Sequence, residues 1–290
     1  RSLALAPRAM MHRLLLSLLL IFVSFPLLAA EPPRPKVGLV LSGGAARGLA
    51  HIGVLKALEE QGIQIDAIAG TSMGTVVGGL YASGYKVEEL EKLALGIDWQ
   101  QALSDAPPRK DVPFRRKQDD RDFLVQQKLS FRDDGSLGLP LGVIQGQNLA
   151  LLLESMLAHA SDTRDFDKLP IPFRAVATDI ASGEKVVFRR GHLPQVIRAS
   201  MSIPAVFAPV ELDGRLLVDG GMVDNIPLDV AREMGVDLAI VVDIGTPLRS
   251  RKELATVVDV LNQSITLMTR RNSEEQLAAL HRDDILIQPP

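Results

Sequence analysis

The stretch Gly70-Thr71-Ser72-Met73-Gly74 stands between a short apolar run, Ala67-Ile68-Ala69, and a stretch with helical character from Thr75 to Ala82. The pattern G-x-S-x-G at a strand-to-helix junction is typical of a nucleophile elbow, a turn so sharp that the serine backbone is strained. The flanking glycines lack the Cβ atoms that would collide in such a turn. The hydroxyl then lies at a helix N-terminus, where the helix dipole favours negative charge. These residues also fit a plain βα turn, so the rest of the chain must decide.

The segment before this turn predicts the fold class. Residues 36–41 form a continuous apolar run that is typical of a buried parallel strand, and residues 42–48 form a glycine-rich loop. An amphipathic helix then reaches Gly62, and a second strand over residues 63–69 enters the elbow. This βαβ order predicts an α/β protein with a parallel sheet covered by helices.

The remaining pattern continues this alternation. We expect an irregular, exposed stretch at 97–120 and a hairpin within 123–141 turned by an Asp-Gly pair. Helices are expected at 86–95, 147–160, 193–200, 228–234 and 256–280, strands at 172–179, 185–188, 238–242 and 285–287, and a small hairpin at 211–218 that turns over Asp213-Gly214.

Composition excludes several classes of function. The 290 residues carry 32 basic and 35 acidic side chains, so the net charge is 32 − 35 = −3, and the basic patch of a nucleic-acid-binding protein is missing. Without cysteine the chain has no disulfides, thiolate metal sites or cysteine nucleophiles. Five scattered histidines show no metal-binding spacing, and we expect neither a metal nor a cofactor. The chemistry must therefore come from hydroxyls, carboxylates and the backbone.

The N-terminal residues predict export. From Met11 a short basic start, His12-Arg13, precedes an apolar run to Leu28 and the small pair Ala29-Ala30. This length is short for a membrane span and typical of a secretory signal peptide, although a retained anchor is the alternative. We therefore expect upstream residues and a signal peptide over 1–30 and one domain over 31–290.

The glycine loop, residues 43–48, is a second candidate site. Its glycines allow successive N–H groups to point into one cavity at the start of a helix, which suits an anion. That anion is either the phosphate of a nucleotide or an oxyanion formed during a reaction. The dinucleotide pattern is incomplete because Ala45 stands at the third loop position and Asp66 precedes its strand, and no P-loop is present. Tight βα packing is a further explanation.

Ser72 and the glycine loop follow neighbouring parallel strands, so we expect them side by side at the sheet edge where α/β proteins bind ligands. A serine nucleophile needs a base. Asp219 ends a predicted strand and is followed by two glycines, which allow close approach, although an Asx turn explains the same residues. His192 offers a second arrangement, the order Ser72, Asp179, His192 of α/β-hydrolases.

Three motifs in this order resemble the patatin-like phospholipase family: Gly43 to Gly48, Gly70 to Gly74, and Asp219-Gly220-Gly221. A block from Arg198 to Phe207 resembles the proline-containing segment that precedes the family's aspartate. The resemblance covers roughly residues 36–245, and it implies a three-layer αβα fold with a mostly parallel central sheet, followed by a C-terminal helical extension.

The resemblance implies residue roles. Ser72 would be the nucleophile and Asp219 the base of a Ser–Asp dyad without histidine. The N–H groups of Gly43, Gly44 and Ala45 would form the oxyanion hole, and Arg47 would brace the loop or contact a lipid phosphate. Ala45 replaces a third glycine of the family, and its methyl group disfavours a positive φ. Which N–H groups point inward is therefore left open.

Together with the predicted signal peptide, the resemblance implies an exported serine hydrolase that cleaves fatty-acyl esters of glycerophospholipids, as a phospholipase A or lysophospholipase. The alternatives are a nucleotide-binding module that uses the glycine loop and a non-catalytic lipid-binding domain. The expected partners are phospholipid and a membrane surface, with a homodimer as a further expectation. The resemblance includes exported bacterial proteins with a POTRA module and a barrel after this domain, so we expect such domains beyond residue 290. The expected location is the periplasm, the outer membrane or the medium.

Overall fold

A computed structural model describes residues 34–105, 130–131, 137–138 and 142–289 of the chain. The chain divides into two units, residues 1–34 and 35–290, and nearly all described residues belong to the second. The predicted signal peptide lies outside the described residues, as do residues 106–120 of the predicted irregular stretch.

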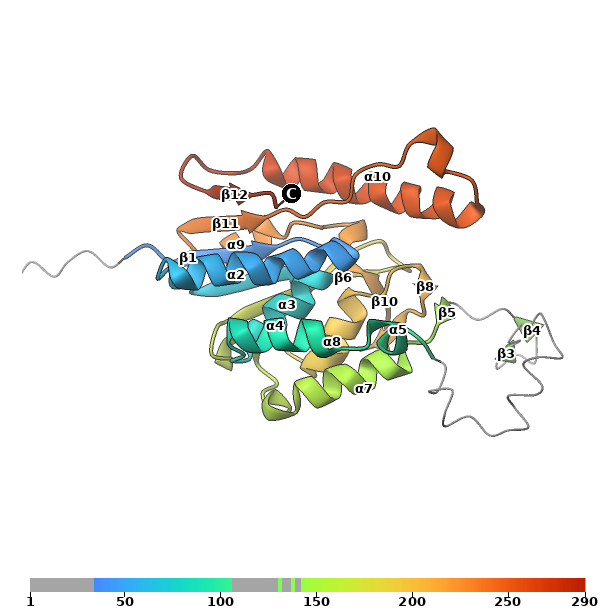
Figure 1. Ribbon diagram of the computed structural model, residues 1–290, viewed down its shortest axis with the longest axis horizontal. Coiled ribbons are helices and arrows are strands. Elements are labelled where there is room, and N and C mark those ends of the chain that lie inside the picture. The colour runs from blue at the N-terminus through green and yellow to red at the C-terminus, as the bar shows by residue number, and fades with distance from the viewer. Residues whose placement is uncertain (1–33, 106–129, 132–136, 139–141, 290) are drawn as a thin grey trace, which may run out of the picture. The chain divides into compact units, whose positions relative to one another are not determined.

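The described elements follow the predicted order closely (Figure 1). The strands are β1 Val37–Leu41, β2 Ala67–Thr71, β3 Ser130–Phe131, β4 Leu137–Gly138, β5 Gly142–Ile144, β6 Phe173–Asp179, β7 Lys185–Phe188, β8 Ala205–Phe207, β9 Val210–Leu212, β10 Arg215–Asp219, β11 Leu238–Val242 and β12 Ile285–Ile287. The α-helices are α2 Ala50–Glu60, α3 Met73–Ala82, α4 Val87–Gly96, α5 Trp99–Ala102, α7 Gln147–Met156, α8 Leu193–Ser200, α9 Leu228–Glu233 and α10 Val257–Leu277. Short 3₁₀ turns are η1 Ala45–Leu49, η3 Ala158–Ala160, η4 Phe166–Lys168, η5 Gly220–Met222 and η6 Arg251–Glu253.

The central sheet has the strand order β12-β11-β1-β2-β6-β10-β9, with β7 also paired to β6. The pairs along β12, β11, β1, β2 and β6 are parallel, whereas β7 and β10 run antiparallel to β6. The register pairs Leu41 with both Gly70 and Val242. The carboxyl ends of β11, β1 and β2 therefore meet at one edge of the sheet, where the glycine loop and the elbow begin.

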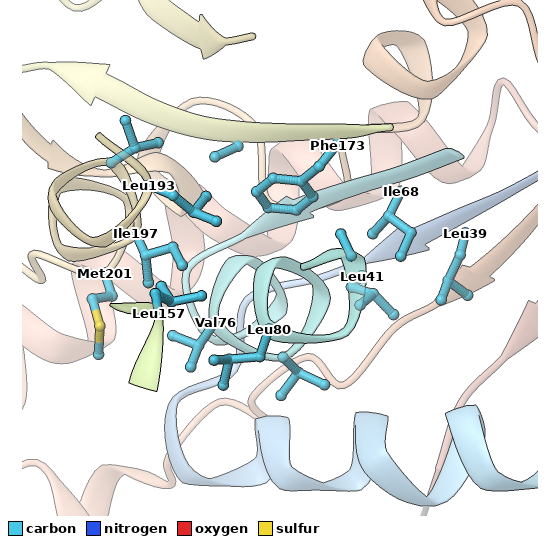
Figure 2. Close-up of a cluster of buried hydrophobic side chains, with 14 of the residues drawn as sticks. Leu39, Leu41, Ile68, Val76, Leu80, Leu157, Phe173, Leu193, Ile197 and Met201 are labelled. Carbon is cyan, nitrogen blue, oxygen red and sulfur yellow. The ribbon is translucent and has the colours of Figure 1, made fainter. Parts of the chain in front are cut away.

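Side chains alternate between the two faces of the sheet. Leu39, Leu41 and Ile68 belong to a buried cluster with α2, α3, α4, α7 and α8, and Figure 2 shows these side chains gathered around α3. Val40 and Val241 belong to a second cluster with α9, against which Leu277 of α10 also packs. Burial of both faces explains why the central strands are continuous apolar runs. The predicted three-layer αβα fold with a mostly parallel sheet is confirmed.

Two regions differ in detail from the expectation. The stretch predicted as irregular contains the single-turn helix α5, whose N-terminus is capped by the side chain of Asp98. Of the predicted hairpin at 123–141, only the antiparallel pair Ser130–Phe131 and Leu137–Gly138 lies among the described residues. No helix in the described part of the chain combines the length and apolarity that a membrane crossing requires.

Candidate active site

Ser72 occupies the single position between β2 and α3, with φ 53° and ψ −121°. This backbone conformation is strained for a residue with a side chain. The Ser72 carbonyl accepts hydrogen bonds from Thr75 N (2.9 Å) and Val76 N (3.2 Å). Its N–H donates to Ser200 Oγ at 3.0 Å. The strained turn predicted from the G-x-S-x-G pattern is therefore present, and hydrogen bonds on both sides hold it.

The glycines around Ser72 permit close packing of the backbone. A Cβ at Gly70 would lie 2.6 Å from the carbonyl oxygen of Gly74, and a Cβ at Gly74 would collide with the carbonyl oxygen of Leu41. Glycine is therefore required at both positions because the first turn of α3 lies directly against the ends of β1 and β2.

Asp219 ends β10 and is buried beside Ser72. Ser72 Oγ donates to Asp219 Oδ2 at 2.6 Å, and Gly221 N donates to Oδ1 at 2.8 Å. Burial raises the pKa of the Asp219 carboxyl to about 6, against the hydrogen bonds from Ser72 and Gly221, which lower it. The fold thus joins a hydroxyl and a carboxylate 147 positions apart in the sequence. An ionised carboxylate in this place can accept the serine proton.

The glycine loop lies next to this pair, and its N–H groups differ in their partners. Gly43 N–H donates to the Asn225 side-chain oxygen (3.1 Å) and to the Asn225 carbonyl oxygen (3.3 Å). The N–H groups of Gly44 and Ala45 have no acceptor among the described residues. Of the three donors that the resemblance implies for the oxyanion hole, those of Gly44 and Ala45 are thus free among the described residues, whereas that of Gly43 holds the loop to the segment after Asp219.

The expectation that Ala45 avoids a positive φ is wrong, because its φ is 49°. The 3₁₀ turn η1 begins at Ala45, and Arg47 N donates to Gly44 O at 3.1 Å. Packing against Ile244 limits the preceding position as well, since a Cβ at Gly44 would lie 2.7 Å from Ile244 Cδ1. The loop therefore keeps a tight turn although a methyl group replaces the third glycine.

The serine, the aspartate and the glycine loop all face a cavity of about 730 Å³. Its lining includes Ser72, Asp219 and residues 43–45, together with residues of α10. Arg47 is exposed at this cavity and forms no ion pair with any described residue. The apolar side chains in the lining are Ile203, Val206, Met222, Pro247, Ile265 and Leu277.

The histidine arrangement is not assembled. His192 Nε2 bonds to Glu154 Oε1 at 2.7 Å, and His192 does not line the cavity around Ser72. The Asp179 carboxylate accepts from Ala181 N–H and the Ser182 hydroxyl instead of from an imidazole. The order Ser72, Asp179, His192 is therefore wrong as a spatial triad.

His51 is buried in α2 and contacts Ser42, the residue that precedes the glycine loop. Its Nε2 lies 2.8 Å from the Ser42 carbonyl oxygen, and burial lowers the pKa of the imidazole to about 4. The ring is therefore neutral at physiological pH. Because a carbonyl oxygen only accepts, Nε2 carries the proton and Nδ1 is a buried atom without a partner.

Two supporting segments were not recognised as such in the sequence. Ser200 and Ser202 lie in and after α8: Ser200 Oγ accepts from Ser72 N–H, and the Ser202 carbonyl accepts from Asp219 N–H at 2.9 Å. The second segment follows Asp219 and includes Asn225, which forms hydrogen bonds to Asn272 and Ser273 of α10. The resemblance marked residues 198–207 as a motif, but nothing in the pattern said which atoms it supports.

The comparison with known proteins identifies the family. The model of the family described as patatin-like phospholipase matches residues 39–232, which include the glycine loop, Ser72 and Asp219. The chain belongs to the patatin-like phospholipase family. The serine–aspartate pair of this patatin-like chain thus lies inside the matched segment, whereas α10 lies outside it.

Curated relatives agree with this membership. The uncharacterized NTE family protein Rv1063c of Mycobacterium tuberculosis is 37% identical over 210 residues, which cover 72% of this chain and 49% of the relative. The lysophospholipase NTE1 of Cryptococcus neoformans is 35% identical over 217 residues, covering 73% of this chain and 11% of that protein. The chain thus spans about half the length of the first of these relatives and a small part of the second.

Among solved structures, the chain is similar to VipD from Legionella pneumophila, with a TM-score of 0.48 and 18% identity over 88% of this chain and 61% of that chain.

Proposed function

We propose that this patatin-like chain is a serine-dependent lipid hydrolase that cleaves fatty-acyl esters of glycerophospholipids, as a phospholipase A or lysophospholipase. The observation that carries the proposal is the 2.6 Å hydrogen bond from Ser72 Oγ to Asp219 Oδ2 at a strained elbow. Membership of the family supports the reaction class, and the name of the fungal relative supports a lysophospholipid as substrate.

In the proposed reaction Asp219 Oδ2 accepts the Ser72 proton while Ser72 Oγ forms a bond to the acyl carbonyl carbon. The N–H groups of Gly44 and Ala45 stabilise the resulting oxyanion. The tetrahedral intermediate collapses, its bond to the glycerol oxygen breaks, and the proton on Asp219 passes to that oxygen. Water then attacks the acyl carbon of the acyl-serine while Asp219 accepts its proton. The bond between Ser72 Oγ and the acyl carbon breaks, the proton on Asp219 passes to Ser72 Oγ, and the fatty acid leaves.

The cavity suggests how a lipid would be placed. Apolar side chains near Ser72, among them Ile203, Val206 and Met222, suit an acyl chain. Arg47 at the same cavity, which forms no ion pair with a described residue, suits the phosphate of the head group. Met201 and Phe207 lie in the same block as Ile203 and Val206, residues 198–207. Their side chains are buried in the core and would not contact a membrane.

Two experiments test the proposal. Wild-type protein should release fatty acid from phospholipid or lysophospholipid micelles and should react covalently with a fluorophosphonate probe at Ser72. Ser72→Ala should lose both while unfolding at the same temperature. Hydrolysis at the wild-type rate by Ser72→Ala would exclude the nucleophile. A folded wild-type protein that binds vesicles but ignores the probe would support the lipid-binding alternative, and stabilisation by NAD or ATP would support the nucleotide-binding one.

Export to the periplasm, the outer membrane or the medium remains part of the proposal. It depends on residues 11–30, outside the described residues. Fractionation of cells that express the full sequence would test it, with the shortened mature protein expected outside the cytoplasm.

A further inference from the structure

Helix α10 lies outside the segment that matches the family, and yet it forms one wall of the cavity. The residues of α10 that line the cavity include Asn262, Thr266, Thr269 and Ser273. Its opposite side is exposed, as at Val260, Leu267 and Met268. The family motifs therefore do not explain why α10 places these polar side chains in the lining of the cavity.

A chain of buried hydrogen bonds joins α10 to the glycine loop. Ser273 Oγ donates to the Thr269 carbonyl oxygen at 2.9 Å, and Asn225 Nδ2 donates to Ser273 Oγ at 3.1 Å. Asn225 Oδ1 accepts from Gly43 N–H at 3.1 Å. Asn225 is 1% exposed and Ser273 is 7% exposed. Because the side chains of Asn225 and Ser273 are nearly buried, each relies mainly on the other groups of this chain for its hydrogen bonds.

This chain determines the orientation of the Asn225 amide. The single proton of the Ser273 hydroxyl is used for the Thr269 carbonyl, so the hydroxyl oxygen can only accept from Asn225. The NH₂ group of Asn225 must then face α10, and its oxygen must face Gly43. A second link is made by Asn272, whose side chain accepts from Asn225 N–H at 3.0 Å and donates to the Gly221 carbonyl at 2.9 Å.

The position of the Asn225 amide matters because the glycine loop has no spare room. A Cβ at Gly43 would lie 2.6 Å from Asn225 Oδ1 and 3.0 Å from Ser72 Cβ. Gly43 is thus enclosed between Asn225 and Ser72. A change in the Asn225 side chain would move the peptide that precedes the N–H groups of Gly44 and Ala45, and a small displacement of such donors weakens oxyanion stabilisation.

We propose that Asn225 is a positioning residue for the glycine loop and that Ser273 of α10 holds its amide in the working orientation. This inference rests on the proposed function, because it assigns to the chain of hydrogen bonds a role in stabilising the oxyanion. It makes α10 a part of the machinery that sets the reaction rate and not only a cover of the sheet.

The test compares two serines of α10. Ser273 Oγ and Ser264 Oγ each donate to the carbonyl four residues before, both at 2.9 Å, but Ser264 lies on the exposed side of the helix. Ser273→Ala and Ser264→Ala therefore remove the same kind of intrahelical hydrogen bond. Only Ser273→Ala also removes the acceptor of the Asn225 amide. The substrate is a lysophospholipid micelle and the probe is a fluorophosphonate.

Ser273→Ala should lower kcat and the rate of fluorophosphonate labelling by about tenfold, as expected when a buried amide loses a partner worth about 1.4 kcal/mol. KM should stay within about twofold of wild type, since the proposed role of Ser273 concerns the oxyanion donors and not the binding of the lipid. Ser273→Thr keeps the hydroxyl and should restore the rate, and Ser264→Ala should behave as wild type. Asn225→Ala should lower kcat at least as much as Ser273→Ala.

Equal kcat values for Ser273→Ala and Ser264→Ala would overturn the inference. So would a loss in Ser273→Ala that is explained fully by a smaller fraction of folded protein, measured by thermal unfolding. If wild-type protein is labelled at Ser72 and Ser273→Ala is labelled at the same rate, only this inference fails. If folded wild-type protein neither labels nor hydrolyses the lysophospholipid, the proposed function fails and this inference with it.

Discussion

The elbow at Ser72 and the glycine loop lie side by side, but they are held in different ways. The turn of the elbow is formed by its own neighbours, because Thr75 N–H bonds to the Ser72 carbonyl and glycines allow α3 to approach β1, and a distant residue, Ser200, accepts from the Ser72 N–H. The glycine loop depends on distant residues, because Ser42 bonds to Val242 and Ile244 and Gly43 bonds to Asn225. The elbow thus combines a local turn with a distant hydrogen bond, whereas the glycine loop is held by contacts between segments about 200 positions apart.

The largest expected effect concerns the elbow. Ser72→Ala and Ser72→Gly should each lower turnover by on the order of 10⁴-fold or more, because both remove the nucleophile. They should differ in stability. Glycine adopts φ 53° without strain, so Ser72→Gly should be more stable than Ser72→Ala by about 1 kcal/mol in urea unfolding. Equal stability of the two variants would show that the turn is not strained.

Asp219→Asn should lower kcat by about 10³- to 10⁴-fold, because the amide cannot accept the serine proton. The variant should also change the pH dependence of stability. The folded carboxyl has a pKa of about 6, above its ordinary value of 3.8, so the wild type loses stability as pH rises through this window. The unfolding free energy of Asp219→Asn relative to wild type should therefore increase by about 3 kcal/mol between pH 4 and 7. If the unfolding free energies of Asp219→Asn and wild type changed in parallel with pH, the raised pKa of the buried Asp219 carboxyl would be contradicted.

For the glycine loop the corresponding group is His51, and the sign is opposite. Burial lowers the imidazole pKa from 6.5 to about 4, so the neutral ring stabilises the fold above pH 6.5. This stability, about 3 kcal/mol, is lost as pH falls from 6.5 to 4. His51→Gln keeps an N–H donor for Ser42 but does not titrate. Its free energy of unfolding should fall less than that of wild type in this window, as measured by urea unfolding at each pH.

Activity should follow the ionisation of Asp219. Because the base must be ionised, kcat/KM should fall about tenfold for each pH unit below about 6. Measurement with a soluble short-chain ester between pH 4.5 and 8 avoids changes in the lipid surface. A rate that does not depend on pH across this range would mean that Asp219 is not the base.

The smallest effect is expected at His192, outside both halves of the site. Its partner Glu154 has a 44% exposed side chain, so the contact between the two side chains contributes no more than about 1 kcal/mol. His192→Ala should therefore keep kcat within about twofold of wild type and unfold at nearly the same temperature. A thousandfold loss of kcat would reinstate the histidine triad and remove the distinction between the elbow pair and its surroundings.

The sequence-based predictions succeeded where a local pattern determines the structure and failed where distant contacts determine it. The order of strands and helices, the two-faced sheet and the elbow were all predictable, because each depends on a local pattern of apolar residues, glycines and turn residues. The conformation of Ala45 was predicted wrongly. The intrinsic preference of alanine disfavours φ 49°, but packing of the glycine loop against Ile244 and its bonds to Asn225 outweigh that preference.

The sequence by itself determined that a serine would stand at a strained turn beside a loop of backbone donors, because parallel strands end at a common edge. Only the tertiary structure decided which acid reaches Ser72, which loop N–H groups are free, and that α10 contacts the loop through Asn225. These outcomes depend on hydrogen bonds between residues 48 to 182 positions apart. No local pattern encodes such bonds, since they form only when the sheet order and the packing of α10 bring the partners together.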